Sequence, residues 1–271
     1  MAAIGNTELT ASKNQLIVAL VQRELISKAV VMPSIMDASV YAVKGTKSIN
    51  VPRAGSFAVE DRATTVQAAL VGVTYAVDTI VLDQMSTVSW VVDPQDEIEA
   101  QIDVQADLAA RAAKAHAKNF DTKVIAGLEA DATATTTAGA ISKAIFLEMR
   151  QALLTAEADA GQLTFLCGPD SETALLQIGD FVQSYAYGQA IIPTGLLGKL
   201  YGVEVKISTQ IGANTFYMYD KEGYGFAIQQ ALAMGERPAP EYGSSAVLKV
   251  LDMKWGHDKL QNGALLKKDN N

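Results

Sequence analysis

Cysteine and histidine are scarce in this chain of 271 residues. It has one cysteine, Cys167, and two histidines, His116 and His257, far apart in sequence. A single thiol excludes an internal disulfide and a zinc site built from several thiolates, so we expect neither a metal nor a cofactor. Cys167 ends an apolar stretch, which indicates a small buried residue. His116 lies between Lys114 and Lys118, which predicts a solvent-exposed helix face.

The chain also lacks an excess of positive charge. It carries 22 Lys and Arg against 30 Asp and Glu, a net charge of −8. This balance argues against a dedicated nucleic-acid binder, which needs a basic surface. No apolar run approaches the ~20 residues that span a bilayer, and residues 1–8 show no signal peptide. We therefore expect no membrane partner and folding in a cytoplasm. Hydrophobic residues, at 49%, exclude a wholly disordered chain.

Signatures of catalysis are missing too. No nucleophile elbow occurs. Residues 194–199 resemble a phosphate-binding loop, but Pro193 replaces the first required glycine and Leu200 the Ser or Thr that holds magnesium. A cluster of four carboxylates would suit a divalent cation, yet acidic residues at a helix N-terminus need no such role. The cluster consists of Asp93, Asp96, Glu97 and Glu99. We therefore predict that the protein is not an enzyme.

Two helices are predicted from apolar periodicity. The first covers residues 10–32 and ends at Pro33. The second covers residues 93–129, with Asp93 as N-cap and apolar spacings of four, four and three. It would be about 54 Å long. Its stripe is mostly alanine, so its packing partner lies close; a coiled-coil arm is the alternative, although the Leu and Ile of a stable seam are missing.

A long two-stranded ribbon with a polar tip is predicted for residues 39–78. The tip, residues 52–62, holds four charges, a proline and a glycine. An isolated ribbon is only marginally stable in water, so this one needs a surface to lie on. Residues rich in β-branched side chains predict strands at 40–43, 48–51, 66–77 and 80–82.

The second half of the chain has an α/β pattern. Residues 130–140 contain no large side chain and predict a surface loop at a domain boundary. A last strand, apolar on both faces, is predicted for residues 246–255, and residues 267–271 are expected to fray. Between them we expect helices at 141–156 and 171–178, strands at 163–167 and 202–208, and a hairpin of strands 216–219 and 224–228.

The order of these parts resembles the major capsid protein of tailed bacteriophages, an α+β protein with the Hong Kong 97-like fold. Asp78-Thr-Ile-Val-Leu-Asp-Gln84 and the helix after it resemble the strand-and-spine segment of that family. Residues 198–208 resemble the late strand of its axial domain, and residues 220–224 the turn back to its peripheral domain. The resemblance implies an N-terminal arm at 1–38, an extended E-loop at 39–78, a peripheral domain with the spine helix at 79–136, an α/β axial domain at 137–225, and a return to the peripheral domain at 226–271.

The resemblance also implies a function. Copies of the chain would form hexamers and pentamers that close into an icosahedral shell around double-stranded DNA, assembled in the host cytoplasm and present in the virion. The implied partners are other copies, a portal protein, a separate scaffolding protein, decoration proteins, and DNA contacted non-specifically. At the E-loop tip, the residues expected to contact a neighbouring subunit are Pro52, Arg53, Phe57, Glu60, Asp61 and Arg62.

Three further interpretations remain open. Some family members cross-link their loops through lysine and asparagine, and Lys44 and Lys47 lie in the ribbon. An encapsulin-like nanocompartment shares the fold but encloses enzymes instead of DNA. A cytoplasmic α+β enzyme with an appended arm is the alternative from another class.

Overall fold

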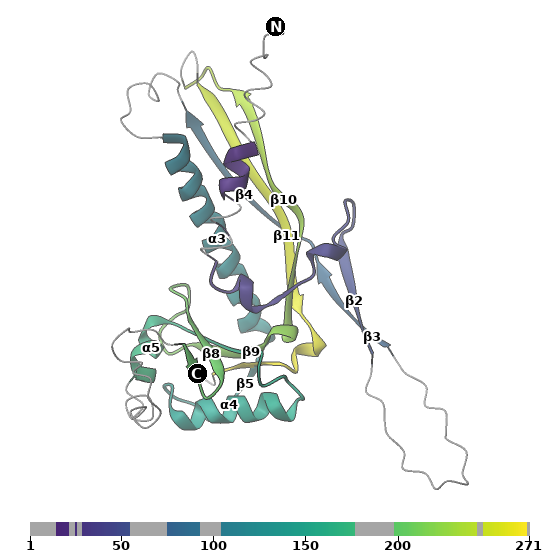
Figure 1. Ribbon diagram of the computed structural model, residues 1–271, viewed down its shortest axis with the longest axis vertical. Coiled ribbons are helices and arrows are strands. Elements are labelled where there is room, and N and C mark those ends of the chain that lie inside the picture. The colour runs from purple at the N-terminus through teal and green to yellow at the C-terminus, as the bar shows by residue number, and fades with distance from the viewer. Residues whose placement is uncertain are drawn as a thin grey trace, which may run out of the picture.

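The computed structural model describes residues 15–21, 25, 29–54, 75–92, 104–176, 198–242 and 246–269. Its architecture combines a long sheet flanked by a helix, a smaller α/β body at one end, and a ribbon that projects to one side (Figure 1). The predicted α+β fold class is confirmed.

A four-stranded sheet forms the long part of the molecule. In spatial order its strands are β1 (Met36–Asp37), β10 (Tyr224–Pro238), β11 (Val247–Lys259) and β4 (Gln84–Val92). β11 is antiparallel to both neighbours, whereas β1 is parallel to β10. Alternate residues of β11, such as Leu251, Met253 and Trp255, are buried. The predicted last strand therefore exists, but the prediction that both of its faces are apolar is wrong, because one face packs in the core and the other is only partly covered.

Helix α3 (Val104–Asp131) packs against the sheet and extends about 42 Å. Its buried alanines, including Ala113 and Ala117, allow a close approach. The Phe120 ring lies 4.5 Å from the Trp255 ring, centroid to centroid. The prediction of a long alanine-striped helix is confirmed for this range, whereas its expected start at Asp93 lies outside the described residues.

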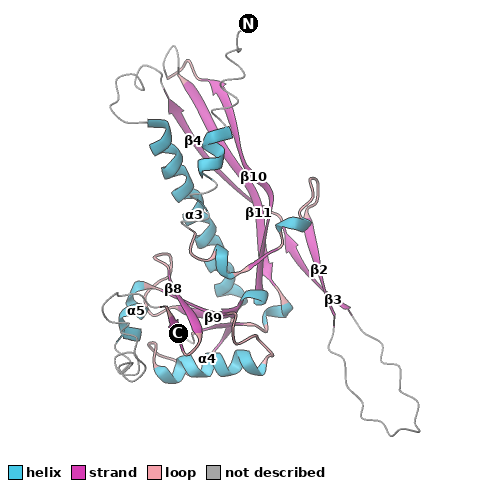
Figure 2. Ribbon diagram, in the orientation of Figure 1, coloured by secondary structure: helices cyan, strands magenta, loops and turns pink. Residues whose placement is uncertain are grey.

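A six-stranded sheet forms the smaller body. Helix α4 (Lys143–Thr155) packs on it, and helix α5 (Pro169–Leu176) follows its central strand (Figure 2). Ser142 caps α4 by accepting a hydrogen bond from the Ile145 N–H. In spatial order the strands are β5 (Thr133–Ala134), β12 (Leu266–Lys268), β9 (Phe216–Asp220), β6 (Leu163–Cys167), β8 (Val203–Ile207) and β7 (Lys199–Leu200).

The predicted hairpin of residues 216–228 is wrong. Both strands exist, but β9 belongs to the six-stranded sheet and β10 to the four-stranded sheet. The turn between them is the 3₁₀ helix η4 (Lys221–Gly223), which Asp220 caps by accepting from the Glu222 N–H. A Cβ at Gly223 would lie 2.8 Å from the Leu265 side chain, so only glycine fits this crossing between the sheets.

Two predictions near the N-terminus need correction. Residues 15–21 and 25 are helical, but residues 29–31 are not, and Pro33 lies in the 3₁₀ helix η1 (Met32–Ser34). The helix ends early because the Val30 and Val31 N–H groups bond to a side chain of α3, described below. The predicted strand at residues 40–43 is instead the 3₁₀ helix η2 (Ser39–Tyr41) and a turn.

The C-terminal residues are ordered where the structure describes them. Lys267 and Lys268 pair with β5 and β9, and Asp269 is buried, so the prediction of fraying is wrong for these residues. Residues 226–271 thus contribute strands to both sheets. The division of the chain into arm, E-loop, peripheral and axial domains remains our proposal.

Candidate functional site

The ribbon has an exposed apolar face. Strands β2 (Ser48–Ala54) and β3 (Tyr75–Val81) pair antiparallel along their whole length. Directly opposed residues share a face, which places Pro52, Tyr75 and Val77 on one side. The Tyr75 and Val77 side chains are 68% and 56% exposed, and this face carries no charged residue in either strand. An apolar face on a projecting ribbon is suited to contact with another molecule.

The root of the ribbon is fixed to the body. Ile49 and Ile80 are buried in a small cluster with Leu260. The Asp78 carboxylate accepts a 2.9 Å hydrogen bond from the Gln261 N–H. Beyond this root, the ribbon extends away from both sheets (Figure 1). Its orientation is therefore set by the body, and its exposed face is left for a partner.

The sequence-predicted tip residues are only partly placed. Pro52 and Arg53 lie in β2, opposite Val77 and Ala76. Lys44 and Lys47 are both exposed near the start of the ribbon. The other predicted contacts, Phe57, Glu60, Asp61 and Arg62, lie outside the described residues, as do the four carboxylates at 93–99.

An exposed apolar elbow, residues 39–46, was missed by the sequence analysis. Val40, Tyr41 and Val43 are 89%, 64% and 65% exposed. Yet their backbone is held: Gln229 Nε2 donates to the carbonyls of Val43 and Thr46. β-Branched residues here were interpreted as a strand, and nothing local indicated an outward-facing turn. The elbow adds a second apolar surface beside the ribbon.

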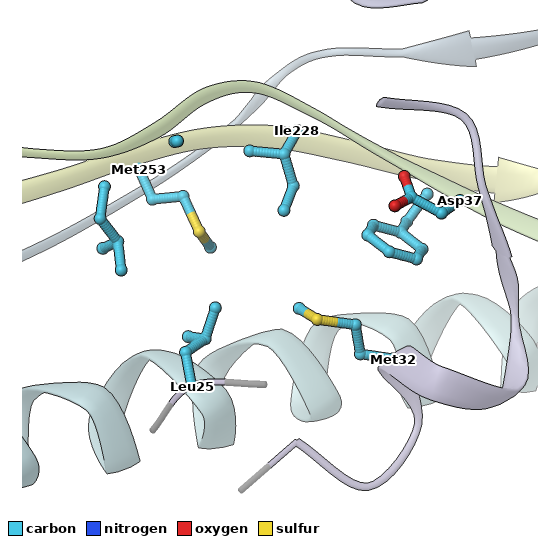
Figure 3. A pocket seen from close by; sticks show the side chains of 8 residues that line it. Leu25, Met32, Asp37, Ile228 and Met253 are labelled. Atoms are coloured by element: carbon cyan, nitrogen blue, oxygen red, sulfur yellow. The ribbon is translucent and has the colours of Figure 1, made fainter. Parts of the chain in front are cut away.

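An apolar pocket of about 110 Å³ lies beneath the N-terminal segment. Leu25 and Met32 point into it from one side, and Ile228 and Met253 from the long sheet (Figure 3). Among the described lining residues, only Asp37 is charged, and its carboxylate already accepts from the Ser39 N–H. The pocket therefore offers space for apolar groups and no catalytic pair.

A buried carboxylate of α3 attaches the arm. Asp121 is 4% exposed and accepts hydrogen bonds of 3.0 and 3.1 Å from the Val30 and Val31 N–H groups. Burial raises the pKa of Asp121 above its ordinary value, and the two N–H groups oppose that change. No local sequence pattern around Asp121 indicates this attachment, because its partners lie about ninety positions earlier in the chain.

Both histidines lie between α3 and the sheet. His116 is 1% exposed, with Nδ1 3.0 Å from the Ser86 hydroxyl, so the prediction of a solvent-exposed face is wrong. Ala113 and Ala117 are buried on the same side of α3, so His116 lies on the helix face that packs in the core. His257 Nδ1 lies 2.7 Å from the Tyr224 hydroxyl. Gly127 makes room for this pair, since a Cβ there would overlap the Tyr224 oxygen.

Acidification is expected to destabilise this interface. Burial lowers the pKa of His116 and His257 below 6.5, and the nearby carboxylates Asp252, Asp83 and Asp131 do not outweigh it. The unfolded chain therefore binds more protons, and stability falls as the pH drops below about 7, by at most about 1.4 kcal/mol per pH unit for each histidine. Urea unfolding between pH 7 and 5, above the ordinary carboxylate range, measures this slope.

The matched variant is His116→Gln with His257→Gln. It removes both titrations, so its free energy of unfolding should change less over the same pH range. Equal slopes in the variant and the original chain would show that the histidines do not cause the acid sensitivity.

The described residues offer few side-chain groups suited to catalysis. Burial raises the pKa of the Cys167 thiol to about 12, which leaves it unreactive. Within the described part of the chain, no group of three or more His, Cys, Asp or Glu side chains could hold a metal ion. None of the described helices is long and apolar enough to cross a membrane.

Comparisons with known proteins agree with this architecture. The chain is similar to a protein of Mycobacterium phage Che8, with a TM-score of 0.71, 17% identity, and coverage of 89% of this chain and 91% of that one. It is similar to the capsid of cyanophage P-SCSP1u, with a TM-score of 0.68, 15% identity, and coverage of 89% and 88%. A virus-like particle from Pyrococcus furiosus gives a TM-score of 0.62, 13% identity, and coverage of 95% and 99%.

Sequence comparison identifies the family. No curated protein matches the chain. The family model described as phage capsid protein matches residues 88–246, more than half of the chain. The match begins within β4, includes α3, most of the smaller body and β10, and ends just before β11. The chain therefore belongs to the phage capsid protein family and has the Hong Kong 97-like fold of tailed-phage major capsid proteins.

Proposed function

We propose that this capsid protein assembles into hexamers and pentamers that close into an icosahedral shell around double-stranded DNA. The observation that carries the proposal is the projecting ribbon, with its uncharged and solvent-exposed face of Pro52, Tyr75 and Val77. A two-stranded ribbon gains stability when it lies on another surface. A neighbouring copy supplies such a surface at every position of a shell.

The tip would set the register of this contact. We infer that Pro52 and Phe57 pack on the neighbouring subunit. The residues that form ion pairs with it would be Arg53, Glu60, Asp61 and Arg62. Charged pairs at an interface contribute specificity more than affinity. Cross-links through Lys44 or Lys47 would be compatible with this arrangement, because both side chains are exposed.

The shell requires further partners in this proposal. A portal protein, a separate scaffolding protein and decoration proteins would act with the shell, which is assembled in the host cytoplasm and retained in the virion. The net charge of −8 suits a container that holds DNA without binding it tightly over its whole surface. The protein itself would have no catalytic role.

A nanocompartment that encloses protein cargo is the second candidate. This candidate is supported by the similarity in fold to a virus-like particle from Pyrococcus furiosus, which covers 95% of this chain. The match to the phage capsid protein family argues for a structural protein and against a cytoplasmic α+β enzyme with an appended arm.

Electron microscopy and sedimentation of the expressed full chain test the proposal. We expect ring-shaped capsomers or megadalton particles, and particles from infected cells should contain double-stranded DNA. A small oligomer at every concentration would contradict the shell. Particles that contain protein cargo and no DNA would support the second candidate instead.

A further inference from the structure

A polar groove of about 410 Å³ lies where three parts of the chain meet. Helix α3 forms one wall, the residues at and after the end of β8 form another, and Val30 of the arm closes one end. The lining residues are Val30, Lys114, Ala117, Lys118, Asp121, Ile207, Ser208, Thr209 and Gln210.

The lysine side chains of this groove have no ion-pair partner among the described residues. Lys114 and Lys118 are exposed and lie one helical turn apart on the same side of α3. Among the described residues, no partner forms an ion pair or a hydrogen bond with the ammonium group of either lysine. Arg111 continues the same stripe and pairs with Asp107 at the surface. The result is a local cationic strip on a protein whose overall charge is negative.

The only carboxylate of the groove is already satisfied. Asp121 is buried and accepts from the two arm N–H groups of Val30 and Val31. The remaining polar lining is neutral. Gln210 accepts from Thr122 Oγ1 and donates to Thr209 Oγ1, which holds this amide beside the lysines. Cations next to neutral hydroxyl and amide groups suit an anionic ligand.

We propose that this groove binds phosphate groups of the nucleic-acid backbone enclosed by the shell. The inference rests on the proposed function, in which the shell holds DNA. Backbone contacts in protein–DNA complexes come from Lys, Ser, Thr and Gln side chains without sequence readout. Lys114 and Lys118 are about 6 Å apart along the helix axis, close to the rise of two nucleotides of one strand, about 6.8 Å.

DNA suits the groove better than an acidic protein segment does. The lining offers spaced cations and neutral donors, but its apolar residues are limited to Ala117, Ile207 and Val30. A folded peptide normally needs a larger apolar contact for its affinity. The negative charge of the rest of the chain would confine DNA contact to such strips.

Binding of a fluorescent 20-base-pair duplex to the full chain, held as unassembled subunits, tests the proposal. The double variant Lys114→Gln with Lys118→Gln should lose two phosphate contacts, so the slope of log affinity against log salt should fall by about 1.8. Between 50 and 200 mM salt, the original chain should then lose about tenfold more affinity than the variant does.

Two matched variants complete the test. Lys199→Gln with Lys221→Gln removes the same charge from exposed positions outside the groove and should leave the slope unchanged. Lys114→Arg with Lys118→Arg keeps the charge and should retain binding. Since all four side chains are exposed, thermal unfolding should be the same in every variant.

Three results would overturn the groove assignment. They are no binding of the duplex by the original chain, an unchanged slope in the groove variant, and lysine-dependent binding of poly-glutamate but not of the duplex. Electron microscopy of the same variants separates this outcome from a failure of the proposed function: normal shells with an unchanged slope would refute only the groove, whereas an original chain that forms no shells would refute the function.

Discussion

Subunits that lack residues 52–62 should fold but fail to form shells of normal size and stability. The deletion removes Pro52, Arg53 and the polar tip, and it leaves the ribbon root, where Ile49 and Ile80 are buried. Side chains that anchor an interface often contribute about 2 kcal/mol or more each, and the loss would recur at every copy. Circular dichroism measures folding, and negative-stain electron microscopy measures assembly.

A length-matched variant distinguishes the effect of ribbon length from the effect of the tip side chains. Replacing residues 52–62 with a Gly–Ser sequence of the same length keeps the ribbon long but removes its side chains. If these side chains set the contact, this variant should also fail to assemble. Normal particles from the deletion variant would refute the assigned role of the tip.

Substituting Gly256 by alanine should destabilise the attachment of the ribbon. Gly256 lies in β11, and a Cβ there would be 2.0 Å from the Val81 carbonyl oxygen and 2.9 Å from the Leu82 Cα. These are backbone atoms of the ribbon root, so the overlap cannot be relieved by a rotamer change. Overpacking of this kind typically costs about 1–3 kcal/mol. Urea unfolding of the full chain measures the loss.

Gly235→Ala is the matched control. Gly235 lies in β10 of the same sheet, and a Cβ there meets no atom within 4 Å. Neither glycine has a positive φ, so alanine fits both backbones. The control should therefore keep or slightly raise stability. Equal stability of the two alanine variants would contradict the close approach of the ribbon to β11.

Helix α3 connects the histidine interface with the attachment of the N-terminal segment. His116 and His257 lie between this helix and the sheet, and Asp121 of the same helix attaches the arm. A shift in the position of α3 would therefore alter its contacts with the arm and the sheet and change the shape of the groove. Variants in these residues are best compared by both unfolding and particle formation.

Several elements followed from short-range patterns in the chain. The alanine stripe predicted α3, and the apolar spacing over residues 141–156 predicted α4. The apolar run at residues 163–167 predicted β6, which is fully buried. The ribbon strands followed from β-branched residues. In each case neighbouring side chains carry the information, because helix periodicity and strand propensity are local properties.

Other features depended on contacts between distant residues. Residues 216–228 look like a hairpin, yet their strands lie in different sheets because Asp220 caps a 3₁₀ turn and Gly223 packs closely on Leu265. The N-terminal helix ends where Asp121, about ninety positions later, accepts two N–H groups. His116 is buried because the sheet lies against its side of α3.

Local chemistry thus specified most helices and strands and the order of the parts, since each element depends on residues close in sequence. Long-range packing alone selected strand partners, buried the histidines, attached the arm, and exposed the elbow and the groove. These outcomes depend on which surfaces pack against each other. The stabilising contacts involve residues far apart in the chain, so no short sequence pattern indicates them.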